Sequence, residues 1–196
     1  MFTGLIHSVG RVVASGPGPA GIRLVLEPNM AQKARIGGSV AVDGCCLTVA
    51  DFRGDLWAFD VVPETLSRTT LGRKPAGSLV NLELPMMHGE RLEGHFVQGH
   101  IDAIGSVKEA VQGEGGVTMT VELPASLQGQ VVEKGSIAVD GVSLTVARVA
   151  PGTFTVALVP HTLKVTTLGA RAVGDAVNLE GDIIAKYVAS LLSARP

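Results

Sequence analysis

A chain of 196 residues with a formal net charge of -2 has room for one large domain or two small ones, and in either case for a buried core. The near-neutral charge and the lack of any Lys/Arg run argue against nucleic acid or an anionic membrane surface as a partner. No apolar segment is long enough to span a membrane, and the N-terminus has no export signal. The adjacent cysteines Cys45 and Cys46 would form a strained disulfide, so we expect them to be reduced in the cytoplasm.

Short apolar runs, broken by Gly, Pro or Asp, indicate a mostly β protein. In chain order, the first half is predicted to form strands over 5–15 and 22–27, a helical turn around 29–33, and strands over 39–43, 47–52, 56–62 and 79–84. Residues 85–91 have no periodicity and are predicted to be a linker. After Gly181 an amphipathic helix is predicted, with Asp182 as its N-cap and apolar residues at helical spacing: Ile184, Tyr187, Val188, Leu191 and Leu192.

The second half of the chain repeats the first at an offset of 97 residues. The run GSVAVDG at 38–44 returns as GSIAVDG at 135–141, and VNLE at 80–83 returns unchanged at 177–180. About half of the positions between 38 and 83 are identical in the two copies. Six short strands per copy with local turns favour two tandem six-stranded antiparallel β-barrels, and a sandwich is the alternative. The domains are expected at 1–87 and 95–181, with a C-terminal helix at 182–196 that either covers a barrel or, as we favour, joins subunits.

The positions at which the copies differ indicate how each copy is specialised. Cys46 corresponds to Ser143, and, with a shift of two residues, Leu5 corresponds to His100 and Phe2 to Val97. Strand alternation places Cys46 on one face with Thr48, where it is either a small core residue or a reactive thiol. His100 is either a hydrogen-bonded strand histidine or a reactive base. A metal site is not expected, because a spacing of five residues puts His95 and His100 on opposite faces of a strand.

Four motifs in this order resemble the riboflavin synthase family, the trimeric α-chain type, from Met1 to the final helix. They are MFTG at 1–4, GCCLTV at 44–49, GHFVQGHID at 94–102 and DGVSLTV at 140–146. The resemblance implies that two molecules of 6,7-dimethyl-8-ribityllumazine dismutate to riboflavin and 5-amino-6-ribitylamino-uracil, with no cofactor and no metal. It also implies a homotrimer held by the C-terminal helix, with the productive site between barrels of neighbouring subunits, and an association with lumazine synthase.

The resemblance further implies one ring-binding pocket in each copy. The expected residues of the first pocket are Gly4, Leu5, Ile6, Cys46, Leu47, Thr48, Asp60, Val61, Val62, Pro63, Glu64 and Thr65. The expected residues of the second pocket are Gly99, His100, Ile101, Lys134, Ser143, Leu144, Thr145, Ala157, Leu158, Val159, Pro160, His161 and Thr162. In this assignment the reactive residues are divided between the copies, with Cys46 in the first pocket and His100 in the second.

The family's functional positions fall on Phe2, Ser39, Cys46, His100, Thr145 and Asp182. We expect His100 to help remove a proton from the C7 methyl group of one lumazine, since imidazole exchanges protons near neutral pH. Ser39, Cys46 or a water would add to the other lumazine or assist proton transfer, and Phe2 would pack against a ring. Asp182 is an N-cap, a functional carboxylate or both. Asp43 stands where many members have Asn, and both residues suit a left-handed turn.

Two rival functions follow from the same residues. A lumazine-binding protein without turnover would be expected to lose reactive residues, whereas Ser39, Cys46 and His100 are all present. A flavin-dependent reductase with a similar small barrel would need an attached nucleotide-binding domain, for which this chain has no room.

Overall fold

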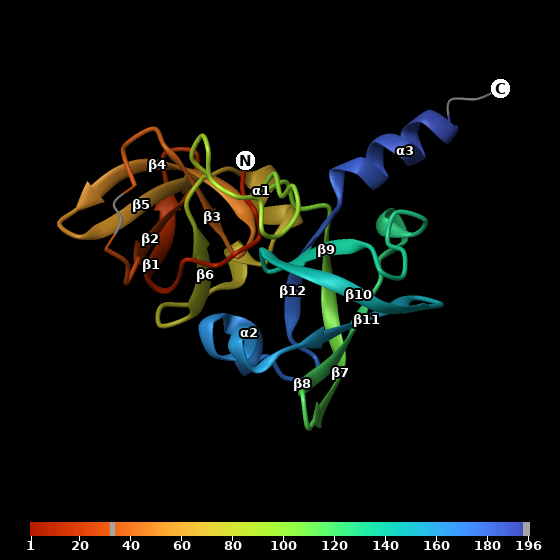
Figure 1. Ribbon diagram of the computed structural model, residues 1–196. Coiled ribbons are helices and arrows are strands. Elements are labelled where there is room, and N and C mark those ends of the chain that lie inside the picture. The colour runs from red at the N-terminus through yellow and green to blue at the C-terminus, as the bar shows by residue number, and fades with distance from the viewer. Residues whose placement is uncertain (32–33, 194–196) are drawn as a thin grey trace.

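The computed structural model describes residues 1–31 and 34–193 and confirms two closed antiparallel barrels of six strands each (Figure 1). The strands of the first barrel are β1 (Ser8–Gly18), β2 (Gly21–Glu27), β3 (Ser39–Val42), β4 (Cys45–Arg53), β5 (Leu56–Val61) and β6 (Leu79–Glu83). Those of the second are β7 (Ala103–Gly113), β8 (Gly116–Glu122), β9 (Ser136–Val139), β10 (Val142–Ala150), β11 (Thr153–Leu158) and β12 (Ala176–Gly181).

Both barrels have the same strand order and irregularities, as a duplication requires. The order β1-β2-β5-β4-β3-β6 of the first barrel corresponds to β7-β8-β11-β10-β9-β12 in the second. A register shift between Val49 and Asp51 recurs between Val146 and Arg148. Each barrel encloses its own cluster of buried apolar side chains, because alternate residues of every strand point inward.

The predicted bounds need correction at several places. The first strand begins at Ser8 instead of residue 5, so Leu5 and Ile6 precede it. The helical turn expected around 29–33 is absent from the described part, 29–31, and the other two residues lie outside the described residues. Short helices that the sequence analysis missed are α1 (Pro63–Arg68), α2 (Pro160–Val165), η1 (Leu71–Arg73), η2 (Ala125–Leu127) and η3 (Thr167–Ala170). Pro63 and Pro160 start α1 and α2, where the missing N–H of proline has no cost.

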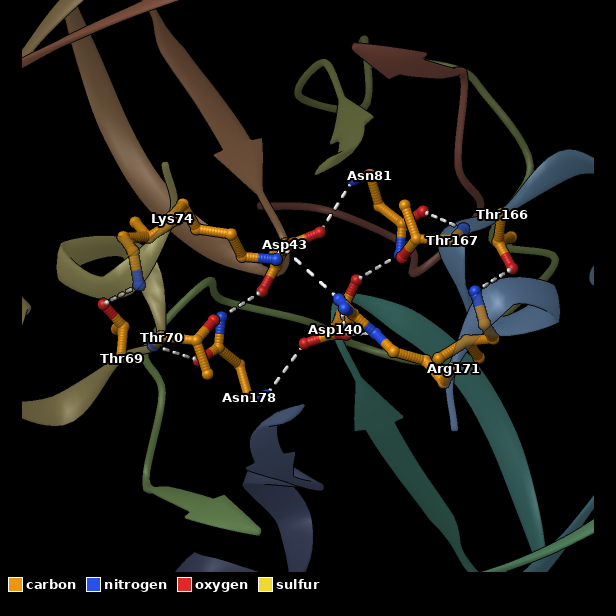
Figure 2. Close-up of polar contacts among 12 residues, drawn as sticks. Asp43, Thr69, Thr70, Lys74, Asn81, Asp140, Thr166, Thr167, Arg171 and Asn178 are labelled. Atoms are coloured by element: carbon orange, nitrogen blue, oxygen red, sulfur yellow. Dashed lines mark hydrogen bonds and ion pairs between the residues drawn. The ribbon is translucent and has the colours of Figure 1, made fainter. Parts of the chain in front are cut away.

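Polar contacts join the two barrels in a nearly symmetric arrangement (Figure 2). The Asn81 side chain donates to the Asp140 carbonyl at 2.9 Å and accepts from the Thr167 amide at 2.8 Å. Asn178 makes the equivalent bonds, to the Asp43 carbonyl at 2.9 Å and from the Thr70 amide at 2.8 Å. All four bonds are buried, so each barrel satisfies backbone groups of the other.

Two fully buried carboxylates lie within this interface. Asp43 pairs with Lys74 at 2.5 Å, and Asp140 pairs with Arg171 at 2.6 Å. Asp43 has a φ of 43°, the left-handed turn expected from its position before a glycine. Asparagine would suit this turn equally, but the full burial of Asp43 and its ion pair with Lys74 make its charge part of the interface.

The C-terminal helix α3 (Ile183–Ser193) extends away from both barrels (Figure 1). Asp182 is its N-cap, since its Oδ1 accepts the amide of Ile184 at 2.9 Å. The apolar residues predicted to form one face are all more than half exposed: Ile184, Tyr187, Val188, Leu191 and Leu192. Within the described chain this face therefore covers neither barrel. Residues 194–196 of the predicted helix lie outside the described residues. Among the described helices, none has the length and apolarity needed to cross a membrane.

Candidate active site

Strand β4 presents Cys46 and Thr48 on the outer face of the first barrel. Cys45, Leu47 and Val49 alternate with them and are buried in the core, as the sequence predicts. Ser39 on β3 lies opposite Thr48 in the ladder, so its half-buried side chain shares this surface. In the second barrel β10 repeats the arrangement with Ser143 and Thr145, and here too the intervening residues are buried.

The segments before β1 and β7 cross to the opposite barrel. The Cys46 amide donates to the Gly99 carbonyl, and the Ser143 amide donates to the Gly4 carbonyl, each at 2.8 Å. Ile101 packs against the core of the first barrel and Ile6 against the core of the second. The predicted grouping by copy is therefore wrong: the Gly99 segment joins Cys46, and the Gly4 segment joins Ser143. We call these groups the first half-site (Gly99–Ile101 with Ser39 and Cys46–Thr48) and the second half-site (Gly4–Ile6 with Ser143–Thr145).

Glycine is required where the crossing segments meet the strands. Gly4 and Gly99 have φ values of +79° and +82°, and a Cβ on either would lie within 2.6 Å of Ser143 or 2.5 Å of Cys46, respectively. The crossing is centred on Phe2 and Val97, which occupy equivalent positions in the two copies and pair with each other as an antiparallel bridge. Phe2 is 1% exposed within a cluster with Val97, Ala41 and Ala138, so in the single chain it has no free face for a ring.

A buried carboxylate holds each crossing segment. Glu83 accepts the amides of Thr3 at 2.6 Å and Gly4 at 3.0 Å, and Glu180 accepts those of Gln98 at 2.7 Å and Gly99 at 2.9 Å. Burial raises the pKa of Glu83, and it raises that of Glu180 to about 7 against the opposing effect of its backbone hydrogen bonds. Neither glutamate is among the predicted site residues, although an identical glutamate at the end of the same apolar run in both copies is a usable signal.

The exchange brings His100 and Cys46 to the same half-site. His100 and Thr48 are exposed, and Cys46 is partly exposed, so this surface is open in the single chain. In the second half-site Leu5 and Thr145 are exposed, and Ser143 is partly buried. The division of reactive residues between the copies therefore does not hold in space, since the segment that carries His100 is bonded through Gly99 to the strand that carries Cys46.

Among the remaining predicted residues, Val61 shares a core cluster with Leu47 of the first half-site, and Leu158 shares one with Leu144 of the second. Asp60–Thr65 span the end of β5 and the start of α1, and Ala157–Thr162 span the end of β11 and the start of α2. Asp60 is paired with Arg23 at 2.8 Å, and Glu64 is paired with Arg68 within α1. Lys134 is an exposed residue with a φ of 65°, equivalent to Gly37 in the first copy.

Comparisons with known proteins agree over the whole chain. The lumazine binding domain model matches residues 3–85 and again 98–182. Riboflavin synthase of Mycobacterium tuberculosis is 45% identical over 197 residues, covering 98% of both chains. Riboflavin synthase of Bacillus subtilis is 37% identical over 189 residues, covering 96% of this chain and 88% of that protein. LumP in complex with riboflavin has the same fold, with a TM-score of 0.85 at 23% identity over 92% of this chain and 99% of that chain.

Proposed function

Because this chain belongs to the riboflavin synthase family and is therefore an enzyme that transfers a four-carbon unit, we propose that the unit passes between two molecules of 6,7-dimethyl-8-ribityllumazine. The observation that carries this proposal is the pair of half-sites, which share one backbone geometry and differ in their reactive side chains. A reaction that joins two identical substrates needs two similar binding surfaces with different chemical duties.

In the proposed reaction, His100 accepts a proton from the acidic C7 methyl group of one lumazine. Cys46 or Ser39 assists addition to the other lumazine or the transfer of its proton, and backbone amides stabilise the charge that develops. We further predict that Thr145 and Lys134 contribute to substrate binding from the second barrel. Asp182 is predicted to have a functional role in addition to capping α3. The backbone hydrogen bond between Cys46 of β4 and Gly99, the neighbour of His100, supports a joint action of His100 and Cys46.

Purified protein incubated with 6,7-dimethyl-8-ribityllumazine alone is expected to form riboflavin, followed by its absorbance or fluorescence. His100→Ala and Cys46→Ala are each expected to slow turnover by about 100-fold, because a positioned acid or base contributes roughly 10²–10⁴-fold to a rate. His88→Ala, in the exposed linker, is the matched control and is expected to keep the wild-type rate. Binding of lumazine without product by the wild type would contradict the reaction, and unchanged rates in both variants would contradict the site.

The exposed apolar face of α3 and the two open half-sites support a homotrimer in which barrels of neighbouring subunits face each other. The five large apolar side chains of this face are more than half exposed in the single chain and would gain burial against a second subunit. We place such an enzyme in the cytoplasm, where the free thiols of Cys45 and Cys46 would stay reduced. An association with lumazine synthase stays a prediction.

Deletion of residues 183–196 is expected to give monomers by analytical ultracentrifugation, together with loss of riboflavin formation. Leu191→Glu is expected to dissociate the assembly as well, because it places a charge on the apolar face. Ser190→Glu changes an exposed polar residue of the same helix outside the apolar set and is expected to leave the assembly intact. A trimer that persists after the deletion would show that other surfaces hold the subunits.

A further inference from the structure

His95 and Ser143 form a hydrogen-bonded pair in the second half-site. The Nδ1 atom of His95 lies 2.7 Å from the Ser143 hydroxyl oxygen. His95 is 7% exposed, and its Nε2 atom is buried without a hydrogen-bond partner among the described residues. The main chain holds the ring in place, since the His95 amide donates to the Thr3 carbonyl at 3.1 Å. The imidazole is therefore fixed behind the serine that faces the half-site.

The neighbouring glycine makes this approach possible. A Cβ on Gly94 would lie 3.1 Å from both the Cβ and the hydroxyl oxygen of Ser143, and it would collide with the Thr3 carbonyl oxygen. The equivalent place in the first half-site is occupied by Cys46, a partly exposed free thiol. The pair thus distinguishes the second half-site from the first.

The buried surroundings decide the charge and the tautomer of the ring. Burial lowers the pKa of His95, with a smaller opposing effect of Asp182, so the ring is neutral at neutral pH. In a neutral ring one nitrogen carries the proton and the other a lone pair. A buried N–H without an acceptor is rarer in proteins than an acceptor with an unused lone pair. The partnerless Nε2 therefore holds the lone pair, and Nδ1–H donates to Ser143.

We propose that His95 is a positioning residue whose Nδ1–H donates to the Ser143 hydroxyl, leaving the hydroxyl proton free to donate to an acceptor atom of the ring bound in the second half-site. The inference rests on the proposed function, because it takes the ring-bearing substrate as the ligand. The hydrogen bond gives the two half-sites different chemistry. In the second half-site the fixed Ser143 hydroxyl would donate to a nitrogen or carbonyl acceptor of the bound ring, whereas the first half-site offers the free thiol of Cys46.

The tautomer is tested without any substrate by ¹⁵N–¹H correlation spectra of the histidine rings, with the His95 signals assigned by their loss in His95→Asn. The expected result is a neutral ring protonated at Nδ1, with a shifted Nδ1 signal in Ser143→Ala. A ring protonated at Nε2, or a charged ring, would overturn the inference even in an active enzyme.

The coupling is tested by fluorescence titration with 6,7-dimethyl-8-ribityllumazine. His95→Phe and Ser143→Ala are each expected to weaken binding by about tenfold, and the double variant is expected to be no weaker than Ser143→Ala alone. His95→Asn should retain binding, since its amide N–H can stand where Nδ1–H stood. Combination with Thr48→Ala, in the first half-site, is the control in which the two losses should multiply.

A double variant in which the losses from His95→Phe and Ser143→Ala multiply would show that His95 acts through packing and would overturn the proposal. Wild-type binding without riboflavin formation would instead remove the proposed reaction, and the affinity comparison would still decide the role of His95. Thermal unfolding of each variant separates loss of the His95–Ser143 hydrogen bond from loss of the fold. In His95→Asn, unchanged signals of the other histidine rings show that the protein is folded.

Discussion

Asp140→Ala is expected to lower the free energy of unfolding by about 3–5 kcal/mol, because it leaves a largely buried cation without its partner. Asp140 is fully buried, and its Oδ2 accepts from Arg171 at 2.6 and 3.0 Å. Its Oδ1 accepts the Asn178 amide at 2.8 Å. Burial raises the pKa of Asp140 to about 6, so at neutral pH the carboxylate is charged and paired. Without it, the ion pair that Arg171 keeps among the described residues is the longer one with Asp43, at 3.8 Å.

Urea unfolding of the two proteins at pH 7 measures this difference. Glu109→Ala serves as the control, because Glu109 is an exposed carboxylate on β7 and such changes usually stay within about 0.5 kcal/mol. A loss of less than about 1 kcal/mol for Asp140→Ala would mean that Arg171 finds another partner and that the pair with Asp140 is not needed for stability.

The fold could be predicted from the sequence because the duplication and the strand alternation are both local patterns. Buried Cys45, Leu47 and Val49 alternate with outward Cys46 and Thr48 in the structure as they do in the periodicity. The six-residue helices α1 and α2 were missed, because so short a segment has too few turns for a helical period to show. Only the paired Pro63 and Pro160 could have indicated where they begin.

The exchange of segments between barrels could not be predicted, because equivalence between copies does not tell which copy a residue contacts. Gly4 and Gly99 are equivalent by sequence, and the strands that they meet are equivalent as well. What decides is the bridge between Phe2 and Val97, a long-range pairing of two residues with no local signal. The spacing of His95 and His100 predicts opposite faces of a strand, whereas His95 lies outside the strands and reaches Ser143 of the same copy.

Phe2→Ala is expected to lower the free energy of unfolding by about 3–5 kcal/mol, the usual range for removing a buried phenylalanine side chain. The Phe2 ring is 1% exposed and packs against residues of both barrels, Ala41 in the first and Ala138 in the second. Its backbone amide donates to the Val97 carbonyl at 2.8 Å, and the return bond is 3.1 Å long. A cavity here would loosen both crossing segments, because Gly4 and Gly99 follow this bridge directly in their copies.

Both half-sites should therefore lose affinity together in Phe2→Ala, which separates this effect from damage to a single surface. Urea unfolding gives the stability, and titration with 6,7-dimethyl-8-ribityllumazine gives the affinity. Phe96→Ala is the matched control, because Phe96 lies beside the same bridge and is 40% exposed, so its removal should change stability by less than about 1 kcal/mol. If Phe2→Ala were as stable as Phe96→Ala, the bridge would not organise the half-sites, and the crossing segments would be held by their other contacts, among them Glu83 and Glu180.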